Sequence, residues 1–208
     1  MSHELKTRLM SGLAAGLIAL VFTLLHPFTF IIMVAAGGVI LWREWNRLTA
    51  ARGNLFLIAG ALYIGGAMLA LVYLRTQSLP ILLSLFAIVW GGDTVAYLVG
   101  KRYGKHKIAP SISPGKSWEG LAASVLASAA IASSAGHVAP LPHALLGAML
   151  AVLGLAGDLF ESWLKRRAGV KDSGALIPGH GGLFDRVDAL LPCAIFSAIA
   201  LYARLTIS

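Results

Sequence analysis

The sequence predicts an all-α, polytopic integral membrane protein with about seven transmembrane helices. Of its 208 residues, 58% are hydrophobic and 12% are charged, whereas a soluble domain has about 25% charged residues. Residues 10–42 contain no Lys, Arg, Asp or Glu. One membrane-spanning helix needs about 20 apolar residues, so this stretch is long enough for two. His26-Pro27 marks the break between them, because proline lacks an N–H group and disfavours helix in the residue before it.

Seven apolar segments follow one another along the chain, separated by short polar connections. They cover residues 9–25, 28–48, 55–74, 79–100, 118–135, 144–165 and 188–207. The fifth segment is rich in Ala and Ser, which in lipid favours close packing between helices. We therefore expect a single membrane-embedded unit over residues 1–208, without a soluble domain.

The positions of the basic residues test this arrangement independently. With the N-terminus in the cytoplasm, 15 of the 17 Lys and Arg residues fall in cytoplasmic segments, as the positive-inside rule requires. Only Arg75 and Arg204 fall on the other side. We therefore expect a multi-pass protein of the cytoplasmic (inner) membrane, with its N-terminus and basic loops in the cytoplasm.

The polar functional groups are concentrated in residues 162–188, where the sixth and seventh predicted spans meet. This segment carries cations suited to phosphates, carboxylates suited to a metal ion, and glycines whose backbone N–H groups could approach an anion closely. The cations are Lys165, Arg166, Arg167, Lys171 and Arg186, and the carboxylates are Asp172, Asp185 and Asp188. Because polar groups in membrane proteins are costly and usually functional, we expect the chemistry here. His180 is a further candidate without an assigned role.

Three acidic residues within the predicted spans extend this candidate site. Asp158 and Glu161 lie three residues apart and so share one face of the sixth helix. Asp93 lies in the fourth span, directly after Gly91 and Gly92. A charge near the bilayer centre costs about 2.5–3.5 kcal/mol. These acids therefore either line a polar cavity or form ion pairs between helices, and both interpretations stay open on spacing alone.

The basic connection over residues 101–116 ends in a second candidate phosphate-binding feature. Its last residues and the start of the next span have the sequence SPGKSWEG. Backbone N–H groups and the dipole of the following helix could converge there with Ser113, Lys116 and Ser117 on a phosphate. The spacing of a Walker A loop is absent. Carboxylates and basic residues without a Cys/His cluster favour Mg²⁺ over softer metals.

At these residues the chain resembles the phosphatidate cytidylyltransferases (CDP-diacylglycerol synthases). The resemblance rests on a C-terminal pattern, S-x-apolar-K-R, four residues, K-D and later H-G-G-apolar-x-D-R-apolar-D, whose fixed positions are all filled. They are Ser162, Lys165, Arg166, Lys171, Asp172, His180, Gly181, Gly182, Asp185, Arg186 and Asp188.

Upstream motifs resemble the same family in the same order. They are Asp93-Thr94-x-Ala96-Tyr97, Gly104-Lys105 and Ser113-Pro114-Gly115-Lys116-Ser117-Trp118-Glu119-Gly120, in which Ser117 stands where threonine is expected. Before this region the chain is similar only in hydropathy and in Glu44-Trp45. We therefore expect N-terminal spans over residues 1–80 and a catalytic region over residues 90–192.

The resemblance implies that phosphatidate attacks the α-phosphorus of CTP, giving CDP-diacylglycerol and pyrophosphate. It implies Asp158 and Asp185 as the principal Mg²⁺ ligands, to which we add Asp93 and Asp188 as supporting groups. We expect Lys165 and Arg186 to act with the two principal acids in catalysis. The substrate-binding residues expected are Ser113, Lys116, Ser117, Arg166, Lys171, Asp172, His180, Gly181 and Gly182. The substrates would require a polar cleft open to both the cytoplasm and the inner leaflet.

The expected partners are CTP, phosphatidate and membrane lipids, and a homodimer stays open. The net charge of +8 could suggest nucleic acid, but the basic residues lie in short loops beside spans, where lipid headgroups or a polyphosphate are the expected ligands. Three other functions also stay open: a CTP-dependent lipid kinase of the polyprenol type, a cytidylyltransferase for another lipid phosphate, and an ion transporter.

Overall fold

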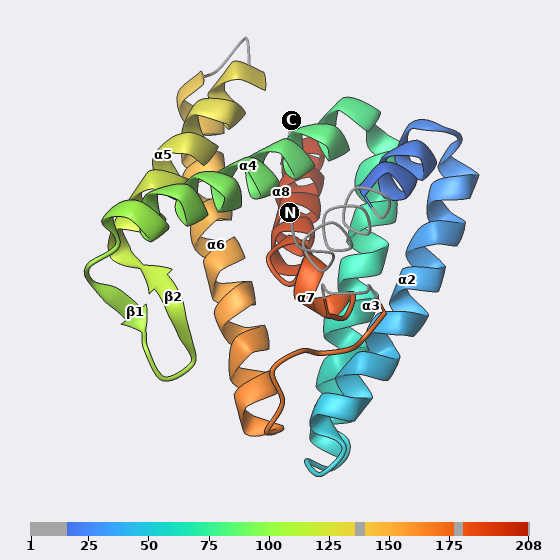
Figure 1. The fold of residues 1–208 in the computed structure, drawn as a ribbon. Coiled ribbons are helices and arrows are strands. Elements are labelled where there is room, and N and C mark those ends of the chain that lie inside the picture. Colours follow the sequence, from blue (N-terminus) through green and yellow to red (C-terminus); the bar gives the residue numbers. More distant parts are fainter. Residues whose placement is uncertain (1–15, 136–139, 177–180, 208) are drawn as a thin grey trace.

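The computed structural model describes residues 16–135, 140–176 and 181–207, and they form a predominantly helical protein (Figure 1). The helices are α2 (Pro27–Thr49), α3 (Asn54–Gln77), α4 (Leu79–Tyr103), α5 (Trp118–Ala135), α6 (Pro140–Arg167), the short α7 (Phe184–Val187) and α8 (Leu190–Ile207). Residues 16–24 form a further helical segment. The all-α prediction is confirmed, and the largest difference in the bounds of these long helices is the start of α6, at Pro140 rather than residue 144.

Four helices in the described part of the chain are long and apolar enough to cross a membrane. They are α2, α3, α4 and residues Leu141–Arg167 of α6. Helices α5 and α8 are shorter, with 18 residues each. In Figure 1, α4 runs obliquely across the view, whereas α2, α3 and α6 run steeply along it. The protein is therefore a helical membrane protein.

The predicted break at His26-Pro27 is confirmed, and the structure shows how it is held. His26 is the N-cap of α2, and its Nδ1 accepts a hydrogen bond from the N–H of Phe28 at 3.2 Å. The buried Arg75 of α3 donates from Nε to the carbonyl of Thr23 at 3.0 Å and from Nη2 to that of Leu25 at 3.3 Å. These carbonyls lie at the end of the preceding helix, where they lack partners within it.

Small residues let α4, α5 and α6 pack closely, as the Ala- and Ser-rich sequence of α5 predicted. A Cβ at Gly147 of α6 would lie 2.7 Å from the carbonyl carbon of Ser128 in α5. On the other side of α5, the Ser128 hydroxyl donates to the carbonyl of Ile88 in α4 at 3.2 Å. Helix α8 lies in the middle of the view in Figure 1 and packs against α3, α4 and α6.

The connection between α4 and α5 differs from the loop that the sequence predicted over residues 101–116. Its first residues continue α4 to Tyr103, and the rest contains a short antiparallel hairpin, β1 (Lys107–Ala109) and β2 (Ser113–Ser117). Lys107 lies opposite Ser117, and Ala109 lies opposite Ser113. Two short strands that enclose a tight turn carry too few apolar residues to show an alternating pattern, so hydropathy alone did not reveal them.

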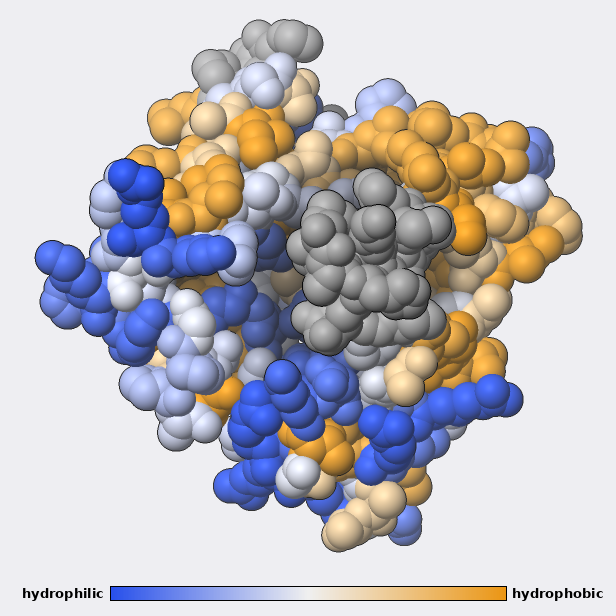
Figure 2. Space-filling view, in the orientation of Figure 1, coloured by the Kyte–Doolittle hydropathy of each residue, from blue (hydrophilic) through white to orange (hydrophobic). Residues whose placement is uncertain are grey.

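On the face of the molecule that Figure 2 shows, hydrophilic and hydrophobic residues occupy different regions. In Figure 2, hydrophilic residues gather toward the left and the lower end of the view, where Figure 1 shows the hairpin, the end of α6 and the turn between α2 and α3. Hydrophobic surface covers much of the upper part of the same view. The polar connections at one end of the helices therefore share one side of the fold.

Candidate active site

The hairpin before α5 places Lys116 beside the helices. At its base, Glu119 in the first turn of α5 has Oε1 2.7 Å from Nδ1 of His106 and accepts the His106 backbone N–H at 3.2 Å. The buried Ser117 precedes α5, and its hydroxyl oxygen accepts the N–H of Gly120 at 3.2 Å, which is the hydrogen bond of a helix N-cap. The first contact ties the start of the hairpin, just before β1, to α5, and the second ties the end of β2 to α5. Together they hold the strand that carries Lys116 against α5.

A cavity of about 490 Å³ opens between α4, the hairpin, α5 and α6. Its polar lining comes from Asp93, Tyr97, Lys101, Lys107, Lys116, Ser117 and Ser124. Gly100, Gly104, Gly115 and Gly120 also line it. A Cβ at Gly100, Gly104 or Gly120 would lie within 3.2 Å of the Ser117 hydroxyl oxygen, so these three glycines allow α4 and α5 to pack closely around Ser117. Ser113, at the far end of β2, is not among the lining residues. The cavity therefore combines a basic entrance with one carboxylate in its wall.

Four charged residues interact with one another beside this cavity, and we call them the Lys116 cluster: Asp93 and Lys116, which line the cavity, and Asp158 and Asp188, which do not. Lys116 Nζ forms an ion pair with Asp158 Oδ2. Burial lowers the pKa of Lys116, but the negative charges of the three aspartates outweigh burial and raise it above its ordinary value. Lys116 is therefore a cation at any physiological pH. Three of the four predicted metal-binding acids thus lie near one lysine.

A second group, the Lys165 cluster, consists of Glu161, Lys165 and Asp185. Lys165 Nζ lies 2.5 Å from Glu161 Oε2 and 2.6 Å from Asp185 Oδ1. The other oxygen of Asp185 accepts hydrogen bonds from the N–H and hydroxyl of Ser173, both at 2.9 Å, and from the N–H of Gly182 at 2.8 Å. Burial raises the pKa of Asp185, but the interactions with Glu161 and Lys165 and the backbone N–H donors outweigh it and hold the pKa at about 2.

The remaining predicted residues lie around these clusters. Arg166 donates from Nε to the carbonyl of Ile112 and from Nη1 to that of Val170, each at 3.3 Å, and so links the end of α6 to the hairpin. Lys171, Asp172 and Arg186 are exposed. The Asp172 carbonyl accepts a hydrogen bond from Arg47 of α2 at 3.2 Å. His180 lies outside the described residues.

The glycines of the pattern lie against carboxylates of the protein itself. Gly181 has a φ of +79°, a left-handed conformation that favours glycine. A Cβ at Gly181 would lie 2.5 Å from Asp185 Oδ2. The substrate-binding role predicted for Gly181 and Gly182 stays a prediction.

The structure places two further residues at the Lys165 cluster: Glu44 of α2, which the sequence analysis named only as part of Glu44-Trp45 without a role, and Ser173, which it missed. Ser173 has no exposed surface and Glu44 is 7% exposed. A signal for Glu44 was present, because it is the one carboxylate in the predicted span over residues 28–48, and an acid within a span is a candidate functional residue. Ser173 carried no comparable signal.

The donor chemistry of the site fits Mg²⁺, which prefers carboxylate and phosphate oxygens. Among the described residues, no three Asp, Glu, His or Cys side chains form a ready-made metal-binding group. Asp158 and Asp185 instead each have a lysine as counter-ion. The two carboxylates thus already hold cations, and substrate phosphates would supply the further oxygens that an octahedral ion needs.

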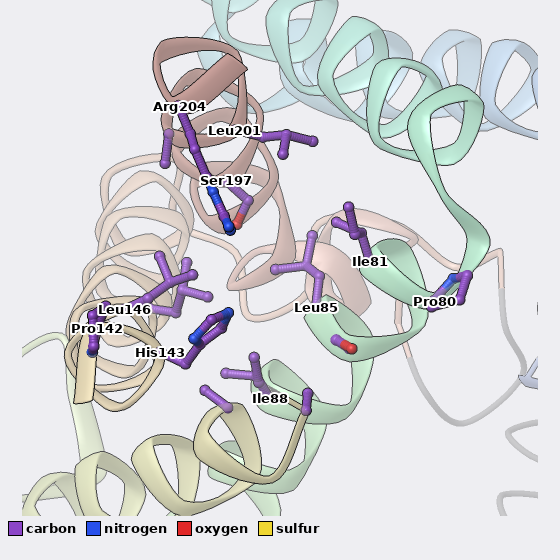
Figure 3. A pocket seen from close by; sticks show the side chains of 15 residues that line it. Pro80, Ile81, Leu85, Ile88, Pro142, His143, Leu146, Ser197, Leu201 and Arg204 are labelled. Carbon is purple, nitrogen blue, oxygen red and sulfur yellow. The ribbon is translucent and has the colours of Figure 1, made fainter. Parts of the chain in front are cut away.

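A second cavity, of about 440 Å³, lies between α4, α5, α6 and α8 (Figure 3). Ile81, Leu85, Ile88, Leu146 and Leu201 dominate the part of its wall that Figure 3 labels, and His143 and Arg204 are its two basic groups. It contains no acidic residue and none of the predicted site residues. The described charged clusters therefore lie elsewhere, at the hairpin and at α7.

Comparison with known proteins identifies the family of this chain. Residues 55–204 match the Cytidylyltransferase family. The chain belongs to this family. The match includes the hairpin, all four residues of the Lys116 cluster and all three of the Lys165 cluster, whereas Glu44 precedes it. The family resemblance inferred from the sequence is confirmed.

Curated relatives named phosphatidate cytidylyltransferase support the family assignment. The relative from Brucella abortus biovar 1 is 37% identical over 80% of this chain and 64% of its own length. That from Pseudomonas aeruginosa is 39% identical over 91% of this chain and 69% of its own length. That from Rickettsia typhi is 31% identical over 94% of this chain and 91% of its own length. The chain thus spans slightly under two thirds of the Brucella relative.

Proposed function

We propose that the chain is a CTP:phosphatidate cytidylyltransferase, which converts CTP and phosphatidate into CDP-diacylglycerol and pyrophosphate in phospholipid biosynthesis. The relatives above carry the name of this activity. Within the structure, the strongest support is Lys116, which lines the cavity and pairs with Asp158 inside the family region. A cation and carboxylates at one cavity are what a nucleoside triphosphate and its metal ion require.

This reaction needs two anionic substrates to be held together more than it needs a strong base. By analogy with other phosphomonoesters, the second pKa of phosphatidate is about 6, so much of its phosphate is dianionic at neutral pH and can attack CTP directly. A bond forms between this phosphate oxygen and the α-phosphorus of CTP, and the bond from that phosphorus to pyrophosphate breaks. Positioning and charge neutralisation therefore provide most of the catalysis.

We assign Lys116 to the CTP phosphates, and Lys165 with Arg186 to the charge of the departing pyrophosphate. The carboxylates assigned to Mg²⁺ are Asp158 and Asp185, with Asp93 and Asp188 in support. When bound, the ion neutralises phosphate oxygens of CTP. Phosphates entering the site would attract Lys116, whose ion pair with Asp158 is partly exposed, whereas the buried pair of Lys165 and Asp185 would keep its geometry. Ser113, Ser117, Arg166, Lys171, Asp172 and His180 stay predicted substrate contacts.

The membrane arrangement that fits this function has seven spans, with the active site at the cytoplasmic face of the inner membrane. The separation of polar and apolar surfaces in Figure 2 and the 15-to-2 division of basic residues support it. Phosphatidate would enter from the inner leaflet with its acyl chains in lipid, while CTP would enter from the cytoplasm.

The phosphorus that is attacked distinguishes this function from a lipid kinase. Purified protein would receive phosphatidate and CTP labelled at either the α- or the γ-phosphorus. We expect α-label in the lipid product and γ-label in pyrophosphate. Lipid carrying the γ-label, with release of CDP, would identify a kinase instead. Competition between phosphatidate and other lipid phosphates would identify the preferred lipid, and ion flux without CTP turnover would identify a transporter.

The proposed orientation can be tested by labelling single cysteines in intact cells. Cys193 is buried and can be replaced by Ala to remove background. Cysteines at Arg47, Lys107 and Lys171 should be protected from an impermeant thiol reagent added outside, whereas one at Pro140 should react. Reaction of the Lys107 position from outside would contradict the seven-span arrangement.

A further inference from the structure

Both carboxylate oxygens of Glu44 in α2 accept hydrogen bonds from residues about 130 to 140 positions later in the chain. Its Oε1 accepts the backbone N–H of Leu183 at 2.9 Å. Its Oε2 accepts the N–H of Phe184 at 2.8 Å and the hydroxyl of Ser173 at 2.9 Å. The residue is 7% exposed, so water competes little with these hydrogen bonds.

The chain around Glu44 is shaped to receive its carboxylate. A Cβ at Gly182 would lie 2.5 Å from Glu44 Oε1, and a Cβ at Gly174 would lie 3.0 Å from the carboxyl carbon of Glu44. Real Cβ atoms do not make contacts this short with a buried carboxylate, so both positions require glycine while Glu44 is in place. Gly182 belongs to the H-G-G pattern, and packing against Glu44 is one physical reason for glycine there.

Glu44 and Asp185 are linked through shared partners. The hydroxyl of Ser173 lies 2.9 Å from Glu44 Oε2 and 2.9 Å from Asp185 Oδ2. It has one hydrogen and can donate to one of them at a time. The three successive N–H groups of residues 182–184 also divide between the two acids, the first to Asp185 and the next two to Glu44. A shift of Glu44 would therefore move the donors that hold Asp185.

We propose that Glu44 is a positioning residue of the active site, which holds Ser173, Leu183 and Phe184 so that Asp185 faces Lys165. This inference rests on the proposed function, because it gives Asp185 a place in the reaction. Glu44 lies on α2, before the region that matches the family. The N-terminal helices thus contribute to the site, and the matched region alone does not contain every residue that organises it.

The chemistry of the contacts favours glutamate over glutamine at this position. Both carboxylate oxygens of Glu44 accept backbone N–H groups. Glutamine has one acceptor oxygen, and its NH₂ group would face an N–H donor on the other side. Glu44→Gln therefore keeps the size of the side chain but loses at least one of the two backbone contacts, and Glu44→Ala loses both.

The test compares Glu44→Gln and Glu44→Ala with Thr49→Val in purified, full-length protein. Thr49 is a matched control, because it lies on the same helix and is buried, and its hydroxyl donates only to the Trp45 carbonyl within α2. We expect kcat to fall about 10-fold or more in the Gln variant and about 100-fold or more in the Ala variant, as a displaced catalytic group predicts. The KM for CTP should change less than about 2-fold, because binding is spared. Thr49→Val should keep kcat within about 2-fold.

Hydrogen–deuterium exchange supplies a measurement that does not depend on turnover. The amides of residues 182–184 should lose protection in both Glu44 variants, while peptides from α8 and from the hairpin keep theirs. If Glu44 served the fold alone, the yield of folded protein would fall but the remaining molecules would keep the wild-type kcat. That result, or wild-type kcat and protection in Glu44→Gln, would overturn the proposal.

The same experiment separates this inference from the proposed function. If wild-type protein transferred no cytidylyl group, the proposed function and the catalytic consequence assigned to Glu44 would both fail. The exchange measurement would still show whether Glu44 protects the amides of residues 182–184. If wild-type protein were active and Glu44→Gln equally active, only the inference about Glu44 would fail.

Discussion

The two lysine-centred clusters contain the same kinds of group but differ in how they are held. In the Lys116 cluster, the side chains of the ion pair are 29% and 22% exposed, and Lys116 lines the 490 Å³ cavity. In the Lys165 cluster, Lys165 is 12% and Asp185 6% exposed, and the second oxygen of Asp185 accepts two backbone N–H groups and lies 2.9 Å from the Ser173 hydroxyl. One pair is accessible to a ligand, whereas the other is fixed by its surroundings.

This difference suggests a division of work within the site. An accessible pair can exchange partners when a phosphate enters, because water and ligand reach both members. A buried pair with every oxygen satisfied holds its geometry before the substrate arrives, which is the preorganisation that electrostatic catalysis needs. We therefore expect substitutions in the Lys116 cluster to act mainly on substrate handling, and those in the Lys165 cluster to act on stability as well.

The largest expected effect is that of removing either principal carboxylate. Asp158→Asn and Asp185→Asn should each lower turnover by about 1,000-fold or more, because both acids organise charge around the reacting phosphates. Only Asp185→Asn should also destabilise the protein, by about 1–3 kcal/mol, since it breaks charged hydrogen bonds at a buried site. Turnover and thermal unfolding of the purified variants would measure the two effects.

Two outcomes would change the comparison. Near-normal turnover of either variant at saturating Mg²⁺ would remove that residue from the catalytic group. Equal loss of stability in both variants would show that the two clusters are held to the same degree.

A smaller effect is expected from Lys116. Lys116→Ala should lower kcat/KM for CTP by about 10- to 100-fold, because the site loses a cation that faces the phosphates, while membrane insertion stays normal. Arg102→Ala is the matched control, since Arg102 is an exposed cation at the end of α4 and does not line the cavity. A similar loss in both variants would point to a general effect of surface charge.

The smallest effect is expected at the apolar cavity of Figure 3. His143 lines it together with Arg204, and neither residue lines the 490 Å³ cavity beside Lys116. His143→Ala should therefore leave kcat and both KM values within about 2-fold of wild type. A selective rise in the KM for phosphatidate would show instead that lipid chains occupy this cavity during the reaction.

Much of the helical framework could be predicted from the sequence. The bounds of α5 agree with the predicted span over residues 118–135, because a long apolar stretch in a membrane protein must satisfy its backbone hydrogen bonds within a helix. The break before α2 followed from a local rule about proline. The hairpin did not follow, because its short strands depend on contacts such as that between His106 and Glu119.

The candidate site shows the same division. The resembled pattern contains Lys165 and Asp185 at fixed positions, and Asp158 lies four residues before its start, on the same helix as Lys165. Their partners come from elsewhere: Lys116 from the hairpin reaches Asp158, and Glu44 from α2 reaches the segment before Asp185. Such pairings join positions 42 and about 140 residues apart, and no local pattern records them.

By itself, the sequence determined the class of protein, most of its helices and the segment that carries the chemistry. These depend on hydrophobicity, charge and spacing along the chain. Only the tertiary structure decided which lysine neutralises which carboxylate, that Ser173 lies between Glu44 and Asp185, and that the glycines of the pattern pack against carboxylates of the protein. The physical reason is that burial makes an unpaired charge costly, so each buried acid must find its partners, and the packing of distant helices determines which ones lie within reach.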